Sequence, residues 1–171
     1  MIRFGSERFP DWKTVTEYLI KNNENADLLS RAINIARLAH FGQKDKAGAN
    51  YIEHPLRVMK RGKTETEKIC GVLHDVVEDS DLTFEDLEKE GFPSEVIAVL
   101  RCVTKLSEEE DYDSFIERIA QNPVAVQVKI NDLLDNMDVT RFEQLSEQDL
   151  KRLNKYLKAY RKLLSVQIQK N

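Results

Sequence analysis

The sequence predicts an all-α domain, and three features of its 171 residues lead to that fold class. Glycine and proline are scarce, with 6 and 4 occurrences, which favours long helices joined by short connections. Apolar residues recur at intervals of three and four along most of the chain, the spacing of one helical face. Residues 124–130 alternate as a strand would, but the apolar pattern continues to Met137 and no partner strand is evident, so this stretch is predicted as helix.

Composition and length narrow the class of protein further. A chain of 171 residues suits one domain with a sizeable core, so residues 1–171 are expected to form a single domain. The formal charge of −4 argues against a nucleic-acid binder, which needs a basic surface. No signal peptide and no apolar run near the ~20 residues of a membrane span are present, so we expect a cytoplasmic protein. Cys70 and Cys102 lie in apolar helical patterns and are interpreted as core residues of a reducing compartment.

The first elements follow from local signals. Residues 1–9 show no period and are predicted as an N-terminal arm, after which a helix is expected over 10–19. The next helix is predicted over 26–41 and ends at Gly42, a residue type that often terminates helices. A polar loop, residues 43–50, follows.

The remaining elements are also predicted to be helical, giving about eight to ten helices in all. Pro55 suits the first turn of a helix that runs through Met59, and a central helix is predicted over 64–79. Further helices, each with an apolar stripe, are expected over 83–87, 94–105, 115–122, 124–137 and from 146 almost to the end of the chain. Ser146 with Asp149 forms a capping-box pattern at the start of the last one.

The central stretch carries the residues with chemical potential. On a helix, His74, Asp75, Glu78 and Asp79 would fall together, opposite the apolar face. One imidazole and three carboxylates suffice to bind a divalent metal and activate a water; an acidic solvent-exposed face with an incidental histidine is the alternative. Consecutive helical residues point about 100° apart, so other helices must complete a metal site that uses the first two residues.

His54 at a helix start and Asp132 on a polar helical stripe are the candidates for the remaining ligands. Two imidazoles and two carboxylates suit Mn²⁺, Fe²⁺ or Zn²⁺ better than Mg²⁺ or Ca²⁺, which prefer oxygen ligands alone. Such an ion lowers the pKa of bound water and polarises a phosphoryl oxygen. Glu78 and Asp79 would then orient or deprotonate the water.

Five short motifs occur in order along the chain: AHFGQ at 39–43, YIEHPL at 51–56, HDVVED at 74–79, VTK at 103–105 and KINDLLDNM at 129–137. Together they resemble the hydrolase domain of RelA/SpoT-type proteins, within the HD metal-dependent phosphohydrolase superfamily. The resemblance covers about residues 26–160. No synthetase or regulatory domain follows in the sequence, so we expect a chain that resembles the stand-alone small alarmone hydrolases.

This resemblance implies a helical HD bundle and a specific reaction. The reaction is removal of the 3′-pyrophosphate from guanosine 3′,5′-bis(diphosphate) or its pentaphosphate form, which gives GDP or GTP and pyrophosphate. It implies one Mn²⁺, in preference to Fe²⁺ or Zn²⁺, and Glu78 with Asp79 as the catalytic pair. The implied metal ligands are His54, His74, Asp75 and Asp132. The implied substrate contacts are Lys46, Tyr51, Lys105, Asn136 and Tyr156. A nucleotide is the expected partner, and the sequence specifies no oligomeric state.

Two departures from the family pattern leave the substrate open. Asp45 stands where the family usually has an arginine, often stacked on guanine, and an acidic residue would repel phosphate. Lys44 or Lys46 are the nearest substitutes, although lysine lacks a planar guanidinium. Asp135 stands where the family commonly has histidine. An HD phosphohydrolase for NADPH 2′-phosphate or an adenine alarmone is therefore an alternative. A catalytically silent nucleotide-binding module is the other, although it would not require the complete set of ligands and bases.

Overall fold

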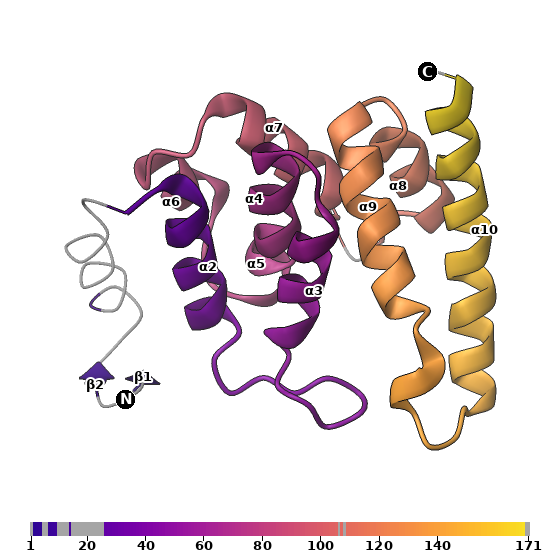
Figure 1. Cartoon of the computed structure of the whole chain (residues 1–171), viewed down its shortest axis with the longest axis horizontal. Coiled ribbons are helices and arrows are strands. Elements are labelled where there is room, and N and C mark those ends of the chain that lie inside the picture. Colours follow the sequence, from indigo (N-terminus) through magenta and orange to yellow (C-terminus); the bar gives the residue numbers. More distant parts are fainter. Residues whose placement is uncertain are drawn as a thin grey trace.

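The computed structural model of the chain describes residues 2–4, 7–9, 14, 26–105, 107 and 109–169. These residues are helical apart from short connections and one small hairpin, so the predicted all-α class is confirmed (Figure 1). The hairpin pairs β1 (Ile2–Phe4) with β2 (Glu7–Phe9) in antiparallel register, within the stretch predicted as an arm. Three residues per strand are too few for an alternating pattern to stand out in the sequence. The helix predicted over 10–19 lies outside the described residues, except for one helical position, Thr14.

The helices follow one another with short connections. They are α2 (Leu28–Ala39), α3 (Glu53–Arg61), α4 (Glu65–Leu73), α5 (Val76–Asp79), α6 (Phe84–Lys89), α7 (Ser94–Val103), α8 (Tyr112–Ile119), α9 (Pro123–Asn136), a 3₁₀ turn η1 (Val139–Arg141) and α10 (Glu147–Gln169). The ambiguous stretch at 124–130 lies inside α9, as predicted. No helix in the described part of the chain has the length and apolar character required to cross a bilayer.

Side-chain caps begin most of these helices. Thr83 and Asp86 form a complete capping box at α6, and Asn122 accepts hydrogen bonds from two backbone N–H groups of α9. The predicted box at α10 is confirmed, because the Asp149 backbone N–H donates to the Ser146 hydroxyl oxygen while the Asp149 carboxylate accepts from the Ser146 backbone N–H. Each cap satisfies backbone donors that a helix start would otherwise leave unpaired.

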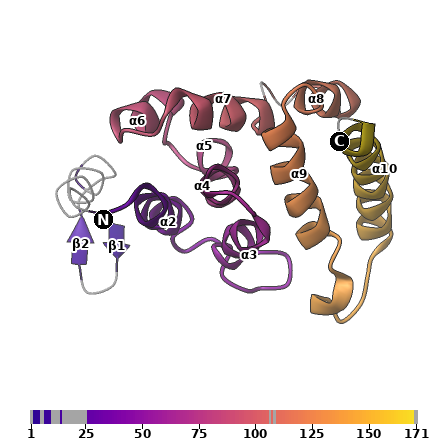
Figure 2. The ribbon, with the colours of Figure 1, turned by 45° about the horizontal axis from the view of Figure 1, so that its top comes forward.

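Helix α4 is the centre of the molecule, and α2, α3, α7 and α9 pack around it (Figure 2). Gly71 of α4 allows α3 to pack closely against it. A Cβ atom at this position would lie 3.2 Å from both the Cα and the N atom of Met59 on α3. The buried side chains of Val72 and Leu73 complete this contact layer. A small residue on α4 therefore sets how near α3 can lie, and both helices carry residues of the predicted metal site.

The prediction of one continuous helix over 64–79 is wrong. The helix stops at Leu73, and His74 and Asp75 form a turn before α5 begins at Val76. The imidazole Nδ1 of His74 lies 2.9 Å from the carbonyl oxygen of Gly71, so the side chain occupies an acceptor that would otherwise receive the next helical N–H. The backbone of Asp75 relaxes to φ −99°, ψ −5°. His74 keeps helical backbone angles, so the departure from the helix begins at Asp75.

Candidate active site

Four predicted metal ligands converge from three parts of the fold. His54 comes from the first turn of α3, His74 and Asp75 from the turn between α4 and α5, and Asp132 from α9. Nε2 of His54 lies 3.2 Å from Oδ1 of Asp132 and 3.6 Å from Oδ2 of Asp75. Nε2 of His74 lies 3.0 Å from Oδ2 of Asp75 and 3.6 Å from Oδ1 of Asp132. The structure thus brings together all four side chains, although the first and the last are 78 positions apart in the sequence.

The two imidazoles are oriented as metal ligands require. Nδ1 of His54 lies 2.7 Å from Oδ2 of Asp135, and Nδ1 of His74 faces the Gly71 carbonyl. These acceptors place the hydrogen on Nδ1 in the neutral tautomers and leave the Nε2 lone pairs facing the cluster. Nε2 of His74 is buried and has no hydrogen-bond partner. Two such nitrogen atoms with two carboxylates fit a divalent cation.

The electrostatics of the cluster also fit a cation. Burial lowers the pKa of His54 and of His74, but the adjacent carboxylates outweigh it, so the pKa of both imidazoles is raised. Burial likewise opposes ionisation of Asp75 and Asp132. The two imidazoles nevertheless hold the pKa of Asp75 below its usual range, and Lys129 with the two imidazoles does the same for Asp132. Without metal, the cluster is neutralised by protons on the imidazoles. A divalent ion would supply that positive charge instead.

Lys129 and Asn136 fix the carboxylate of Asp132. The Lys129 ammonium is largely buried, 2.7 Å from Oδ2, and lies 5.3 Å from the ring centre of Phe115. The amide nitrogen of Asn136 donates to Oδ1, the oxygen atom nearest the imidazoles. The structure therefore directs the Asn136 side chain, which the resemblance places at the substrate, toward a predicted metal ligand.

A layer of charged residues supports His54 from behind. The carboxylate of Asp135 is buried and accepts from His54 Nδ1 and from two nitrogen atoms of Arg57, at 2.7 and 3.0 Å. Burial opposes ionisation of Asp135, but the hydrogen bonds from these two partners hold its pKa below the usual range. Arg141 donates through Nη2 to the Asp135 backbone carbonyl at 2.9 Å. A carboxylate–histidine pair of this kind fixes the orientation of a ligand and raises its basicity.

Glu78 and Asp79 lie in α5, about one turn beyond Asp75, and are reachable from solvent. Partial desolvation and then the neighbouring charge of Asp75 raise the pKa of both carboxyls. A cavity of about 450 Å³ adjoins them, lined by Val77, Glu78, Asp79, Phe84, Thr104, Lys105 and Ser107. The Lys105 backbone N–H is directed at Oε2 of Glu78, at 3.5 Å. Raised carboxyl pKa values in a cleft are what a proton acceptor near neutral pH requires.

A second cavity of about 310 Å³ begins at His54 and is lined by Lys44, Asp45, Lys46, Tyr51, His54, Asn136, Arg141, Phe142, Arg152 and Tyr156. Four of the five predicted substrate contacts lie here, and the fifth, Lys105, lies in the cavity at α5. The Tyr51 hydroxyl donates to Oδ2 of Asp75 at 2.6 Å and so joins the pocket to the cluster. Cationic and aromatic side chains beside a metal-binding cluster suit a phosphorylated ligand that contains a ring.

Comparisons with known proteins place this geometry in a family. The chain is 34% identical over 125 residues to the guanosine-3′,5′-bis(diphosphate) 3′-pyrophosphohydrolase of Aquifex aeolicus, a match that covers 67% of this chain and 18% of that protein. It is 29% identical over 172 residues to the GTP pyrophosphokinase of Streptomyces coelicolor, covering 88% of this chain and 20% of that protein. A solved structure of a metazoan ortholog of SpoT that hydrolyzes ppGpp superimposes with a TM-score of 0.66 and 25% identity, over 85% of this chain and 97% of that one.

The chain is a RelA/SpoT-family hydrolase-like domain. The match to the whole length of the metazoan protein agrees with the helical bundle described above. The chain spans about a fifth of the length of the two bacterial relatives. No protein-family model matches it.

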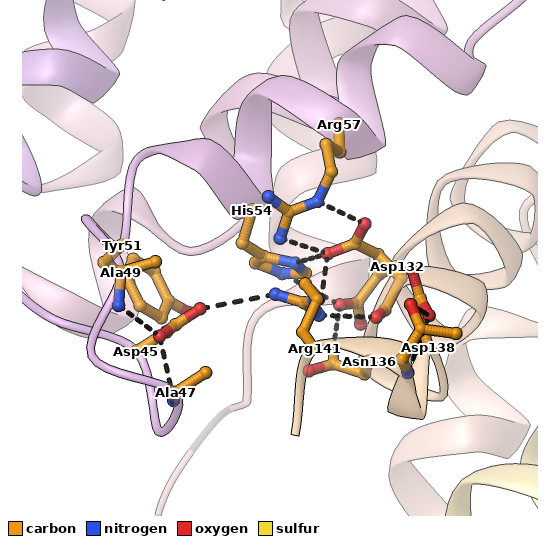
Figure 3. Close-up of polar contacts among 12 residues, drawn as sticks. Asp45, Ala47, Ala49, Tyr51, His54, Arg57, Asp132, Asn136, Asp138 and Arg141 are labelled. Carbon is orange, nitrogen blue, oxygen red and sulfur yellow. Dashed lines mark hydrogen bonds and ion pairs between the residues drawn. The ribbon is translucent and has the colours of Figure 1, made fainter. Parts of the chain in front are cut away.

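Asp45, which departs from the family pattern of this RelA/SpoT-like domain, pairs with Arg141, a contact that the sequence did not predict. Oδ1 of Asp45 accepts from the backbone N–H groups of Ala47 and Ala49, both at 2.9 Å, and so shapes the loop. Oδ2 lies 3.3 Å from Nη1 of Arg141, which reaches across from η1 (Figure 3). A guanidinium therefore lies beside the loop although the loop itself contains none.

Arg57 and Arg141 were not predicted as site residues, and Asp135 was noted only as a departure. Spacing could have suggested the first pair, since Arg57 stands three residues after His54 on α3 and Asp135 three residues after Asp132 on α9. Arg141 is 96 residues from Asp45, and no local pattern links them.

Proposed function

We propose that this RelA/SpoT-like domain is a metal-dependent hydrolase of guanosine 3′,5′-bis(diphosphate) and of the corresponding pentaphosphate, releasing pyrophosphate and GDP or GTP. The observation that carries the proposal is the cluster of two imidazoles and two carboxylates at the end of a cationic, aromatic-lined pocket. The relatives named above act on or make this class of nucleotide by their own descriptions, which supports the choice of substrate.

The metal would be held by His54, His74, Asp75 and Asp132. We propose Mn²⁺, ahead of Fe²⁺ or Zn²⁺, on the resemblance to RelA/SpoT hydrolase domains; the donor set of imidazole nitrogen and carboxylate oxygen, without thiolate, suits all three ions. The Cys70 thiol lies in the core, where burial raises its pKa to about 12. When bound, the ion supplies Lewis acidity, which acidifies water and polarises a phosphoryl oxygen.

Glu78 and Asp79 are proposed to take the proton of the attacking water. Their pKa values are raised, so their carboxylates are better proton acceptors than ordinary ones. The water oxygen forms a bond to the phosphorus next to the 3′ oxygen, and the bond from that phosphorus to the 3′ oxygen breaks. The proton then reaches the departing 3′ oxygen, so the products are a free 3′ hydroxyl and pyrophosphate.

The pocket residues would bind and orient the nucleotide. Lys46, Tyr51, Asn136 and Tyr156 line the cavity next to His54, and Lys105 lies on the α5 side with the proposed catalytic pair. Tyr51 and Asn136 each hydrogen-bond a predicted metal ligand. A nucleotide that contacts either residue would therefore be held at a defined position relative to the metal. We expect no nucleic-acid partner and a cytoplasmic setting, in keeping with the substrate.

Turnover of two nucleotides, measured side by side, tests the proposal. The purified protein would be incubated with guanosine 3′,5′-bis(diphosphate) or NADPH, each with Mn²⁺ or with EDTA. Mn²⁺-dependent loss of the guanosine nucleotide, abolished in Asp75→Asn and retained in Asp113→Asn, is expected; Asp113 is an exposed carboxylate paired with Lys158. Phosphate release from NADPH alone would reassign the substrate, and no turnover of either would reject hydrolysis of the guanosine nucleotide and of NADPH.

A further inference from the structure

Arg141 presents a flat cationic face to the pocket. Its Nη1 lies 3.3 Å from Oδ2 of Asp45, and its Nη2 donates to the Asp135 carbonyl at 2.9 Å. Its Nε is buried, yet 27% of the side chain is exposed. Protein acceptors therefore engage Nη1 and Nη2, which leaves the plane of the guanidinium as the part that a ligand could contact.

The charge around Arg141 disfavours a phosphate contact there. Asp45 offsets the charge of Arg141 directly, and the Asp135 carboxylate, which Arg57 and His54 share, adds a further negative charge 3.6 Å from Nη2. An anion approaching this point would meet both. Lys44, in contrast, donates to the neutral amide oxygen of Asn50, so its positive charge is not offset by that partner. Phosphate is better placed against the lysines, and a neutral ring against the arginine.

The walls next to Arg141 suit a planar ring. Phe142 follows it in the chain, Tyr156 projects from α10, and both line the same cavity. His54 lines the same cavity, so a ligand in the pocket can reach both the predicted metal site and these rings. Guanidinium planes stack on aromatic rings through both dispersion and cation–π attraction.

We propose that Arg141 is the base-contacting residue of the pocket: the purine ring of the nucleotide packs on its guanidinium plane. Asp45 is the positioning residue that holds the plane, through an ion pair between the loop and η1. This inference rests on the proposed function, because it assumes that the pocket takes a nucleotide. It also gives Asp45 a role compatible with binding a purine, since its carboxylate is committed to the loop and to Arg141.

Binding of GDP and of inorganic pyrophosphate to the Mn²⁺-loaded protein tests this proposal by calorimetry. Pyrophosphate has no base, so it reports on phosphate contacts alone. Arg141→Lys keeps the charge and removes the plane, and we expect it to weaken GDP binding about tenfold while pyrophosphate binding is unchanged. Asp45→Asn removes the ion pair that positions Arg141 but keeps the Arg141 side chain. GDP binding is therefore expected to weaken less than in Arg141→Lys. Arg37→Lys, at an exposed position near the end of α2, is the matched control and is expected to change neither constant.

Three results would overturn the proposal. One is an Arg141→Lys protein that binds GDP as the wild type does. Another is an equal loss of GDP and pyrophosphate binding, which would make Arg141 a phosphate contact. The third is a wild-type protein that binds no GDP. Failure of the proposed function would look different: GDP binding would depend on Arg141, but the Mn²⁺-loaded protein would not hydrolyse guanosine 3′,5′-bis(diphosphate). The melting temperature of each variant is measured to check that it is folded.

Discussion

Replacing Asp135 by asparagine tests how the charged layer behind His54 supports the metal centre. The two oxygen atoms of Asp135 accept from His54 and from Arg57 at the same time. Asparagine has one oxygen and one NH₂ group, so it can serve only one of these donors. If its oxygen faces Arg57, the NH₂ group makes Nδ1 of His54 an acceptor, and the hydrogen moves to Nε2, where a metal ligand needs a lone pair. If its oxygen faces His54, the NH₂ group of the asparagine points at the N–H groups of Arg57. Both groups are then donors without an acceptor.

The size of the effect follows from burial. Loss of a partner that orients a metal-bound histidine typically costs 10–100-fold in metal affinity, so we expect the Kd for Mn²⁺ to rise by about that factor. Breaking a buried ion pair costs about 3–5 kcal/mol, but Arg57 is 30% exposed against 1% for Asp135, so we expect about 2 kcal/mol of lost stability. The pKa of Asp135 is lowered, so its contribution is complete at pH 7 and is lost only as the pH falls below the ordinary carboxyl range.

Titration with Mn²⁺, followed by electron paramagnetic resonance, measures the affinity, and urea unfolding at pH 7 measures the stability. Asp113→Asn removes a carboxylate from the surface of α8 and is the matched control. A Kd for Mn²⁺ within about twofold of wild type in Asp135→Asn would refute the argument, because the tautomer of His54 would then not depend on Asp135.

Three further outcomes follow from the structure. Gly71→Ala places a Cβ atom 3.2 Å from the α3 backbone, so urea unfolding should show a loss of about 1–3 kcal/mol; a gain of ~1 kcal/mol from helix propensity alone would contradict the close contact. The raised pKa of Glu78 means that it is protonated at a higher pH than an ordinary carboxyl, so the acid-side fall of kcat/KM should lie above the ordinary carboxyl range, and Glu78→Gln should shift this fall and lose about 10²–10⁴-fold of the rate; an unchanged profile and rate would contradict a role for Glu78. Mn²⁺ at a hundred times its Kd should stabilise the fold by about 2.7 kcal/mol, seen as a higher Tm that EDTA reverses; an unchanged Tm would argue against a metal held by the folded cluster.

The sequence predicted the site best where residue type and helix periodicity pointed to the same role. His54, His74, Asp75 and Asp132 were chosen because their residue types bind metal and their helical positions leave them off the apolar stripes, and the structure brings them together. The resemblance to RelA/SpoT hydrolase domains was confirmed by the comparisons.

Features set by particular side-chain contacts, local as well as long-range, could not be predicted from the sequence. The break at His74 depends on a ring nitrogen bonding the Gly71 carbonyl, a choice that helix propensity does not encode. The pairing of Asp45 with Arg141 joins residues 96 positions apart, and neither residue shows it locally. The direction of Asn136 likewise follows from the place of Asp132 one turn before it, not from its residue type.

Phosphorus NMR of the reaction products is the most direct test of a metal centre that removes pyrophosphate from the 3′ position. Guanosine 3′,5′-bis(diphosphate) would be mixed with the Mn²⁺-loaded protein and the spectrum followed to completion. We predict resonances of GDP and inorganic pyrophosphate only, and no reaction in Asp75→Asn. Orthophosphate, or a nucleotide that keeps a 3′-phosphate, would contradict attack at the phosphorus next to the 3′ oxygen.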